Sequence, residues 1–183
     1  MDISYKTQRL LLRTLDVTYY QQILHFLKSN CVLFERFERD KPSDYYTPEY
    51  QHQAVEYEYQ LIKKKQHLRL FVFLHSNPDK IIGTVSFSNF KHFPTRTCEI
   101  GYKFDPDFHH QGYALEAVEK ALDIIFSEYN MRRVNAYIQP SNTPSLNLVS
   151  NLGFTRKELI QNYAEIQGIS RDHYLYVLDS PYR

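Results

Sequence analysis

The chain has 183 residues, of which 43% are hydrophobic and 15% aromatic, so it can bury a sizeable core and is neither disordered nor fibrous. With 22 Lys and Arg against 21 Asp and Glu, the formal net charge is only +1, which leaves no bulk field to attract nucleic acid or an anionic membrane surface. Five glycines are about 3% of the chain, against roughly 7% in an average protein, so we expect each to occupy a position with a special purpose.

Hydrophobic spacing in the first half of the chain predicts one strand, two helices and then three strands. The first strand is expected over residues 10–12, and the first helix follows the N-cap Asp16 and runs to Leu27. Residues 31–46, which mix charged residues with phenylalanines, suit a mobile loop or a short helix. Thr47-Pro48-Glu49 predicts the start of the second helix, which ends near lysines 63–65. Strands are predicted over residues 68–75, 81–87 and 97–104, with a hairpin turn between the first two.

The second half alternates between the two periodicities. A helix is predicted over residues 114–129, a strand over 134–138, a helix over 142–152 and strands over 154–163 and 171–178. Gly153 stands where a helix end favours positive φ, and Gly168 is expected in the last hairpin. The predicted class is α/β (α+β), with a mixed, mostly antiparallel sheet of about seven strands, about four helices and one strand–helix–strand crossover.

The sequence predicts one domain over residues 1–183 with neither membrane nor nucleic-acid partner. Cys31 and Cys98 are too few for a disulfide framework and form no metal-ligand pattern, which fits a reducing cytoplasm. The longest apolar run, residues 70–74, is too short to span a bilayer, and the N-terminus lacks a signal-peptide pattern. We therefore expect a cytoplasmic protein without a metal, present as a monomer or a homodimer.

Residues 98–117 carry a pattern that suits anion binding. A predicted strand ends at Phe104, and Gln111-Gly112-Tyr113-Ala114 leads directly into the long helix. A helix N-terminus presents unpaired N–H groups and a partial positive charge, and the small residues Gly112 and Ala114 let a pyrophosphate approach that backbone. The simpler alternative is that Gly112 only makes a tight turn into a core helix. No Gly-x-Gly-x-x-Gly or Gly-Lys-Ser/Thr motif is present.

Four motifs, in this order, resemble the GNAT acetyltransferases, and most of all their branch of ribosomal-protein N-terminal acetyltransferases. They are Glu99-Ile100-Gly101-Tyr102, Gly112-Tyr113-Ala114, Asn142-x-x-Ser145 and Leu152-Gly153-Phe154. The resemblance covers nearly the whole chain and implies a GNAT-like acyl-CoA N-acyltransferase fold. One departure is His109, because the loop pattern of the family, Arg/Gln-x-x-Gly-x-Gly/Ala, has Arg or Gln at that position.

The resemblance also implies where acetyl-CoA binds. A strand splayed open near residues 101–104 would pair its backbone with the pantetheine arm, and the loop backbone would bind the pyrophosphate. The residues expected to contact acetyl-CoA are Ile100, Gly101, Tyr102, Lys103, Phe104, His109, His110, Gln111, Gly112, Tyr113, Ala114, Asn142, Ser145 and Asn151. Neither the resemblance nor the histidine spacing implies a metal.

Two residues are candidates for catalysis. Glu99 is the candidate base, or the group that holds a water acting as base, although it could equally be a surface carboxylate pairing across the sheet. Ser145 lies where this branch has a serine near the CoA sulfur, which makes it the candidate acid, and its alternative role is to bond the backbone early in a helix. Backbone N–H groups near Tyr102 are the oxyanion donors that the resemblance implies. Asn142 is expected to cap its helix.

The acceptor is expected to be a protein N-terminal α-amine. Such an amine, with a pKa of about 8, is easier to deprotonate than a lysine, at about 10.4, by about 3 kcal/mol. We predict direct attack on acetyl-CoA in a ternary complex. The alternatives are a small-molecule amine acceptor (a polyamine, amino acid or antibiotic) and a non-catalytic CoA-binding regulatory module. Residues 31–46 are expected to set specificity. His173 could line the acceptor pocket, but we expect it at the surface. A group of five tyrosines suits a pocket wall and half-buried packing equally: Tyr45, Tyr46, Tyr50, Tyr57 and Tyr59.

Overall fold

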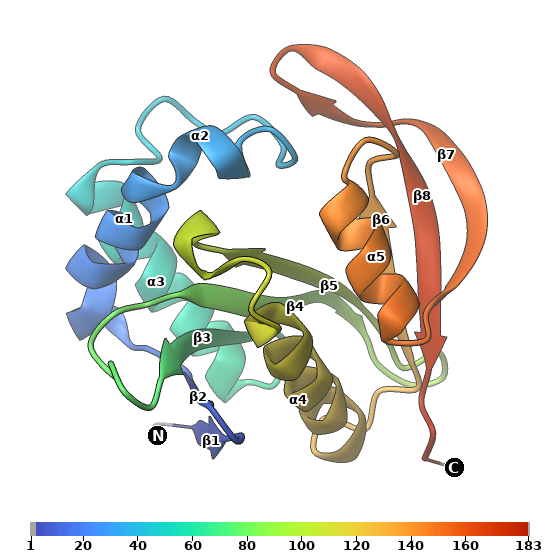
Figure 1. Ribbon diagram of the computed structural model, residues 1–183, viewed down its shortest axis with the longest axis horizontal. Helices are drawn as coiled ribbons and strands as arrows, with labels where there is room; N and C mark the ends of the chain where they lie inside the picture. Colours follow the sequence, from blue (N-terminus) through green and yellow to red (C-terminus); the bar gives the residue numbers. More distant parts are fainter. Residues whose placement is uncertain (1–2, 183) are drawn as a thin grey trace.

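The computed structural model describes residues 3–182, and within them eight strands form one sheet that is accompanied by five α-helices (Figure 1). The strands are β1 (Ser4–Lys6), β2 (Leu10–Arg13), β3 (Leu68–Leu74), β4 (Gly83–Lys91), β5 (Thr97–Phe104), β6 (Arg133–Ile138), β7 (Thr155–Ile166) and β8 (Ile169–Asp179). The helices are α1 (Tyr20–Ser29), α2 (Cys31–Phe34), α3 (Pro48–Lys63), α4 (Tyr113–Ser127) and α5 (Thr143–Asn151). The sheet order is β1-β2-β3-β4-β5-β6-β8-β7, and each neighbouring pair is antiparallel except β5 with β6.

The predicted α/β class and the mostly antiparallel sheet are confirmed, with two additional elements. The additional strand, β1, has three residues, pairs only with β2 and is largely exposed, so it carries no apolar periodicity. The additional helix, α2, is a single turn at the start of residues 31–46, and the described remainder of that segment is not helical. Both alternatives for this segment, a loop and a short helix, are therefore partly right.

Side-chain caps place the helix starts where the sequence predicts them. Asp16 accepts a hydrogen bond from the Thr18 N–H at 2.9 Å and caps a short 3-10 helix, Val17–Tyr19, which leads into α1. Thr47 caps α3, and Asn142 caps α5 by accepting from the Ser145 N–H at 3.3 Å. After α5, Gly153 has a φ of +80°, the left-handed conformation expected of it.

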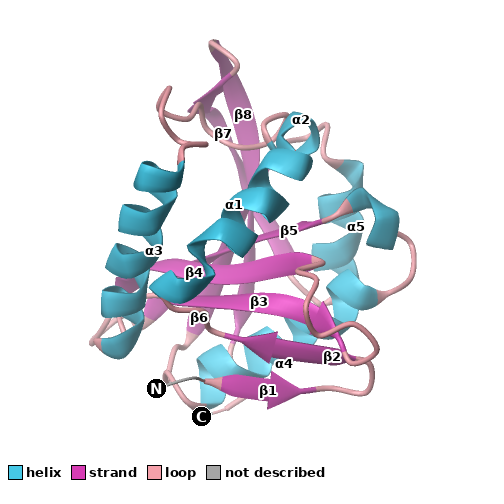
Figure 2. Ribbon diagram, turned by 90° about the vertical axis from the view of Figure 1, so that its left-hand side faces the viewer, coloured by secondary structure: helices cyan, strands magenta, loops and turns pink. Residues whose placement is uncertain are grey.

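The sheet separates two apolar cores. Helices α4 and α5 cover one face, while α1 and α3 cover the other (Figure 2). Strand β3 contributes to both, because its side chains alternate between the faces. Leu70 and Val72 pack into the core with α4, and Phe71 and Phe73 pack into the core with α1 and Val55 of α3. The middle strands of the sheet therefore lie between two layers of packed helices.

Strand β5 leaves β6 part of the way along its length. The two parallel strands pair at only three positions, the last of which joins Glu99 to Asn135. Beyond it the strands diverge (Figure 1), while β5 continues to pair with β4 as far as Phe104. Within the described residues, the edge of β5 from Ile100 to Phe104 has no strand partner on the β6 side. The splayed strand that the resemblance implied is confirmed.

Gly83 provides a test of the β4–β5 packing. It lies opposite Phe104, and an added Cβ would overlap the buried Phe104 ring. We expect Gly83→Ala to lower the free energy of unfolding by about 1–3 kcal/mol, because the ring must shift within a filled core. Gly101→Ala, on the neighbouring strand, is the matched control, since its Cβ would lie 3.5 Å from Ser86 Oγ, an ordinary contact. Urea denaturation measures both variants, and equal losses would contradict this packing.

Candidate active site

The first turn of α4 presents unpaired backbone donors. Gly112, with a φ of +80°, is the N-cap, and the helix begins at Tyr113. The first N–H groups of any α-helix lack a carbonyl partner four residues back, and a glycine N-cap has no side chain to replace it. Together with the helix dipole, these groups form a site for a negatively charged ligand group.

Arg9, near the N-terminus of the chain, holds the start of α4 in place. Its guanidinium donates to the Gln111 carbonyl oxygen at 2.9 Å and to the Glu116 carboxylate at 2.7 Å, and lies 4.6 Å from the centroid of the Tyr113 ring. Burial tends to raise the pKa of Glu116, but hydrogen bonds from Thr7 and Arg9 outweigh it and lower the pKa below its usual range. The negative charge in the first turn of α4 is therefore already engaged by Arg9. No local sequence pattern indicated that Arg9 holds the start of α4, because Arg9 lies about a hundred residues before Gln111 and Glu116.

The histidine at the departure from the family loop pattern bonds within the loop. His109 Nε2 lies 3.0 Å from the Phe104 carbonyl oxygen, which joins the end of β5 to the loop before α4. The Gln111 side-chain amide donates to the Asp107 carbonyl oxygen at 3.0 Å, and His110 has a φ of +59°. The side chains of His109 and Gln111 thus shape the loop, and the backbone N–H groups of α4 remain the available anion donors.

Tyr102 spans the gap between β5 and α5. Its hydroxyl donates to the Ser145 carbonyl oxygen at 3.3 Å, and burial raises the pKa of Tyr102 to about 12, so the phenol keeps its proton. The sequence suggested only backbone functions for Tyr102. Asn151 is the last residue of α5 and is exposed, at the opposite end of the helix from Ser145.

Lys103 ties the end of β5 to residues 31–46. Its ammonium forms an ion pair of 2.5 Å with Glu38, and Glu38 also pairs with Lys41 at 2.7 Å. Burial lowers the pKa of Lys103, although Glu38 opposes that shift. The Lys103 side chain is therefore occupied in packing, and its backbone remains on the open edge of β5.

Glu99 faces an aromatic wall built by β6, β7 and β8. Tyr137 and Tyr163 stack with their centroids 4.5 Å apart, and the His173 ring lies 4.8 Å from that of Tyr163. Besides burial, the charge of Glu99 raises the pKa of both tyrosines, so its carboxylate lies near them. None of the ion pairs found among residues 3–182 involves Glu99. The expectation that His173 lies at the surface is wrong, because it is only 5% exposed behind this wall.

Residues 31–46 contact the β7–β8 hairpin beside the same wall. The two Asp40 carboxylate oxygens accept from the backbone N–H groups of Gln167 and Gly168 at 2.5 and 2.9 Å. Arg39 donates to the Tyr163 carbonyl oxygen at 3.3 Å, and its guanidinium lies 5.2 Å from the centroid of the Tyr163 ring. Figure 1 shows the segment and the hairpin tip approaching each other above the diverging strands. The segment is thus fixed against the hairpin and against Tyr163, one of the tyrosines near Glu99.

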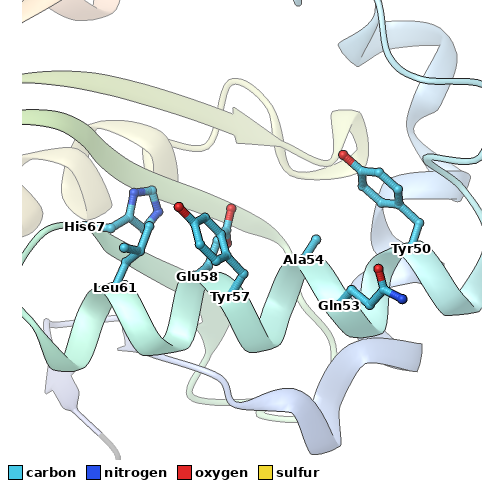
Figure 3. A pocket seen from close by; sticks show the side chains of 7 residues that line it. All are labelled: Tyr50, Gln53, Ala54, Tyr57, Glu58, Leu61 and His67. Atoms are coloured by element: carbon cyan, nitrogen blue, oxygen red, sulfur yellow. The ribbon is translucent and has the colours of Figure 1, made fainter.

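A hollow of about 490 Å³ lies along α3, on the sheet face opposite α4 (Figure 3). Tyr50, Gln53, Ala54, Tyr57, Glu58, Leu61 and His67 line it. His67 is 8% exposed, and its Nε2 has no hydrogen-bond partner among the described residues. Tyr45 and Tyr46 pack with the α1 core, so the five tyrosines that the sequence grouped together occupy different environments.

Residues 3–182 contain neither a metal-binding cluster nor a membrane-spanning helix. No group of three or more His, Cys, Asp or Glu side chains in residues 3–182 is arranged to hold a metal ion. Within the same residues, no helix combines the length and apolar character needed to cross a membrane.

An open strand edge beside an uncapped helix N-terminus defines the acyl-CoA N-acyltransferase type of architecture. A family model described as an acetyltransferase (GNAT) domain matches residues 9–155. The chain therefore belongs to the GNAT acetyltransferase family and is an N-acetyltransferase by class, as its motifs suggested.

Relatives from bacteria support this assignment. The probable N-acetyltransferase YjcK of Bacillus subtilis (strain 168) is 29% identical over 178 residues, which cover 96% of this chain and 97% of the relative. The ribosomal protein uS5-alanine N-acetyltransferase of Escherichia coli (strain K12) is 31% identical over 113 residues, 61% of this chain and 58% of that protein. A crystal structure of ribosomal-protein-S5-alanine acetyltransferase from Vibrio fischeri matches with a TM-score of 0.93 at 26% identity, covering 99% and 98% of the two chains. RimJ of Mycobacterium smegmatis, in complex with CoA-disulfide, shares the fold with a TM-score of 0.86 at 21% identity, covering 93% of this chain and 82% of that one.

The buried His67 predicts a pH dependence of stability. Burial lowers its pKa from 6.5 to about 4. Between these pH values the unfolded chain binds a proton that the folded chain does not, so stability must fall as the pH falls from 6.5 towards 4. We expect His67→Phe to lose less stability than wild type over this interval, by about 1–3 kcal/mol. Urea titrations at several pH values measure the difference, and parallel pH profiles for the two proteins would show that His67 is not held neutral.

Proposed function

We propose that the protein transfers the acetyl group of acetyl-CoA to the α-amine of a protein N-terminus within a ternary complex. The observation that carries the proposal is the continuity of three features: the uncapped N-terminus of α4, the open edge of β5 and the carboxylate of Glu99. The N–H groups of Tyr113 and Ala114 would hold the pyrophosphate. The free backbone of β5 would pair with the amides of the pantetheine arm, as an added strand pairs with a sheet edge.

The residues beside the open strand suit direct transfer. Acetyl-CoA supplies the thioester that the amine attacks. Glu99, directly or through a water, would remove the proton from the incoming amine. Backbone N–H groups near Tyr102 would donate to the carbonyl oxygen as it gains negative charge. The Ser145 hydroxyl, positioned on a helix end that Tyr102 tethers, would donate a hydrogen bond to the leaving thiolate, and since a thiol has a pKa of about 8.5 this help is modest.

Two arguments favour an N-terminal α-amine as acceptor. With a pKa of about 8 it needs only a weak base near neutral pH, and Glu99 is the candidate for that base. The relatives from Escherichia coli and Vibrio fischeri are named for acetylating the alanine of ribosomal protein S5. Tyr137, Tyr163 and the contact of Asp40 with the hairpin leave a bounded approach to Glu99, which suits the thin, extended end of a polypeptide.

The position of the pyrophosphate is tested by two glycines with the same backbone conformation. Gly112 and Gly153 both have a φ of +80°, so Gly112→Asp and Gly153→Asp carry similar backbone strain. Only Gly112→Asp places a carboxylate at the N-terminus of α4, where the added Cβ lies 3.2 Å from Arg9 Nη2 and the negative charge repels an anion. In thermal denaturation, acetyl-CoA at about 100 times its Kd should raise the Tm of wild type and Gly153→Asp by roughly 5–10 °C. Gly112→Asp should show no shift, and a full shift there would refute this position.

Turnover tests the chemical assignment. With acetyl-CoA and a peptide bearing a free N-terminal alanine, wild type should release CoA thiol, and mass spectrometry should find the acetyl group on the α-amine. Glu99→Gln should lower kcat by about 100-fold or more through loss of the base, and Ser145→Ala by about tenfold or less, since the leaving thiol has a pKa of about 8.5 and needs little help. Glu119→Gln, which changes an exposed carboxylate on α4, serves as control and should leave kcat unchanged. Absence of turnover across peptides would reject the peptide acceptor, and full activity of Glu99→Gln would reject the base.

A further inference from the structure

The face of the sheet that meets α3 becomes polar near the open edge. Two rows of side chains lie there: Arg69, Ser86 and Gly101 cross strands β3, β4 and β5 in one row, and Ser88 and Glu99 pair in the next, while His67 directly precedes β3. Their orientation is fixed by contacts, since Arg69 pairs with Glu58 of α3 at 3.0 Å, and Ser86 Oγ donates to the Gly101 carbonyl oxygen at 3.3 Å. The alternate residues Val85 and Phe87 point into the opposite core.

This polar strip joins Glu99 to the hollow along α3. Its middle consists of Ser86, Ser88 and Gly101, whose small or missing side chains leave the sheet surface low and partly exposed. At one end is Glu99, and at the other is His67, which also lines the hollow. Neighbouring strands are about 4.8 Å apart, so β5, which carries Glu99, lies about 10 Å from β3, which begins one residue after His67.

The lining of the hollow favours a cation. Glu58 is its one formally charged lining residue within the described chain, because burial keeps His67 neutral. Tyr57, beside Glu58 in the middle of the hollow, is 66% exposed, so its ring is available for cation–π contact, and Tyr50 lies at one end of the hollow (Figure 3). Arg69 of the sheet pairs with Glu58 at 3.0 Å and balances its charge, so the tyrosine rings must supply part of the attraction for a cation.

We propose that this hollow binds a positively charged group of the acceptor, about 10 Å from the amine that is acetylated. In a peptide acceptor that group is the side chain of the third residue. An extended chain advances about 3.3 Å per residue, and residues one and three project to the same side, so a long basic side chain at position three reaches the hollow. The inference rests on the proposed N-terminal acceptor and adds a sequence preference to it.

The test uses acceptor peptides that differ only at the third residue. Arginine is compared with citrulline, its neutral isostere, and with glutamate, each behind a free N-terminal alanine and followed by an amidated C-terminus. Arginine cannot itself be acetylated, so the product is unambiguous. We expect wild type to prefer arginine to citrulline by about tenfold in kcat/KM, mostly through KM, and to use glutamate least.

Variants at the hollow locate the preference. Tyr57→Ala changes an exposed ring and Glu58→Gln removes the charge, and each should reduce the preference for arginine to about twofold or less while activity on the citrulline peptide persists. Glu56→Gln is the matched control, because Glu56 lies on the same helix, accepts from Gln60 and does not line the hollow, so the preference should be retained.

The outcomes separate this inference from the proposed function. Turnover of all three peptides with equal kcat/KM, or a preference for glutamate, would overturn the cation site and leave N-terminal acetylation standing. A preference for arginine that persists in both hollow variants would also overturn it. If no peptide reacts, the acceptor is instead tested as a small amine with a second positive charge. The rates of acetylation of 1,7-diaminoheptane, which has that charge, and heptylamine, which lacks it, are then measured. Faster acetylation of the diamine, lost in Glu58→Gln, would keep the cation site and replace the peptide by a polyamine, whereas equal rates would reject the site as well.

Discussion

A parallel strand pair that ends after three residues leaves one edge of β5 without its ladder, and the remaining structure around it depends on how that edge is held open. On one side, the Tyr102 hydroxyl reaches α5. On the other side, the Lys103–Glu38 ion pair ties the strand to residues 31–46. At its end, His109 bonds the Phe104 carbonyl oxygen. Each contact holds the strand away from β6 while leaving backbone groups between them free, and this is the geometry that an added strand-like ligand requires.

The elements that the sequence predicted well are those whose signals are local. Asp16, Thr47 and Asn142 cap the helices as expected, and Gly153 adopts positive φ, because caps and left-handed turns depend on a few neighbouring residues. Strand β1 escaped prediction because pairing with β2, and not an apolar pattern, creates it. The burial of His173 was also invisible, since the tyrosine ring that covers it belongs to another strand.

In the candidate site, too, local motifs predicted some features, and contacts between distant segments created the others. The backbone features, the helix start at Gly112 and the opening of β5 after Glu99, were suggested by contiguous motifs and are present in the structure. The side chains that support them come from distant segments: Arg9 against α4, and Arg39 against Tyr163. Such contacts depend on tertiary packing, and a single sequence carries no covariation from which to infer them. Motifs therefore predicted the helix start and the open strand edge, and only the structure identified the side chains that support them.

The near-zero net charge of the chain is reflected in the ion pairs around the site. Charged residues around the site are mostly engaged locally, as in Arg9 with Glu116, Lys103 with Glu38 and Arg69 with Glu58. A protein arranged in this way does not gather ligands through a long-range field, which salt screens within about 10 Å at ordinary ionic strength. Recognition must instead come from short-range groups, and the proposed ones are the N–H donors of α4 for an anion and the tyrosine rings beside α3 for a cation. The two ends of the proposed reaction, an anionic donor and a cationic acceptor, are thus kept on opposite faces of the sheet and meet only where β5 and β6 part.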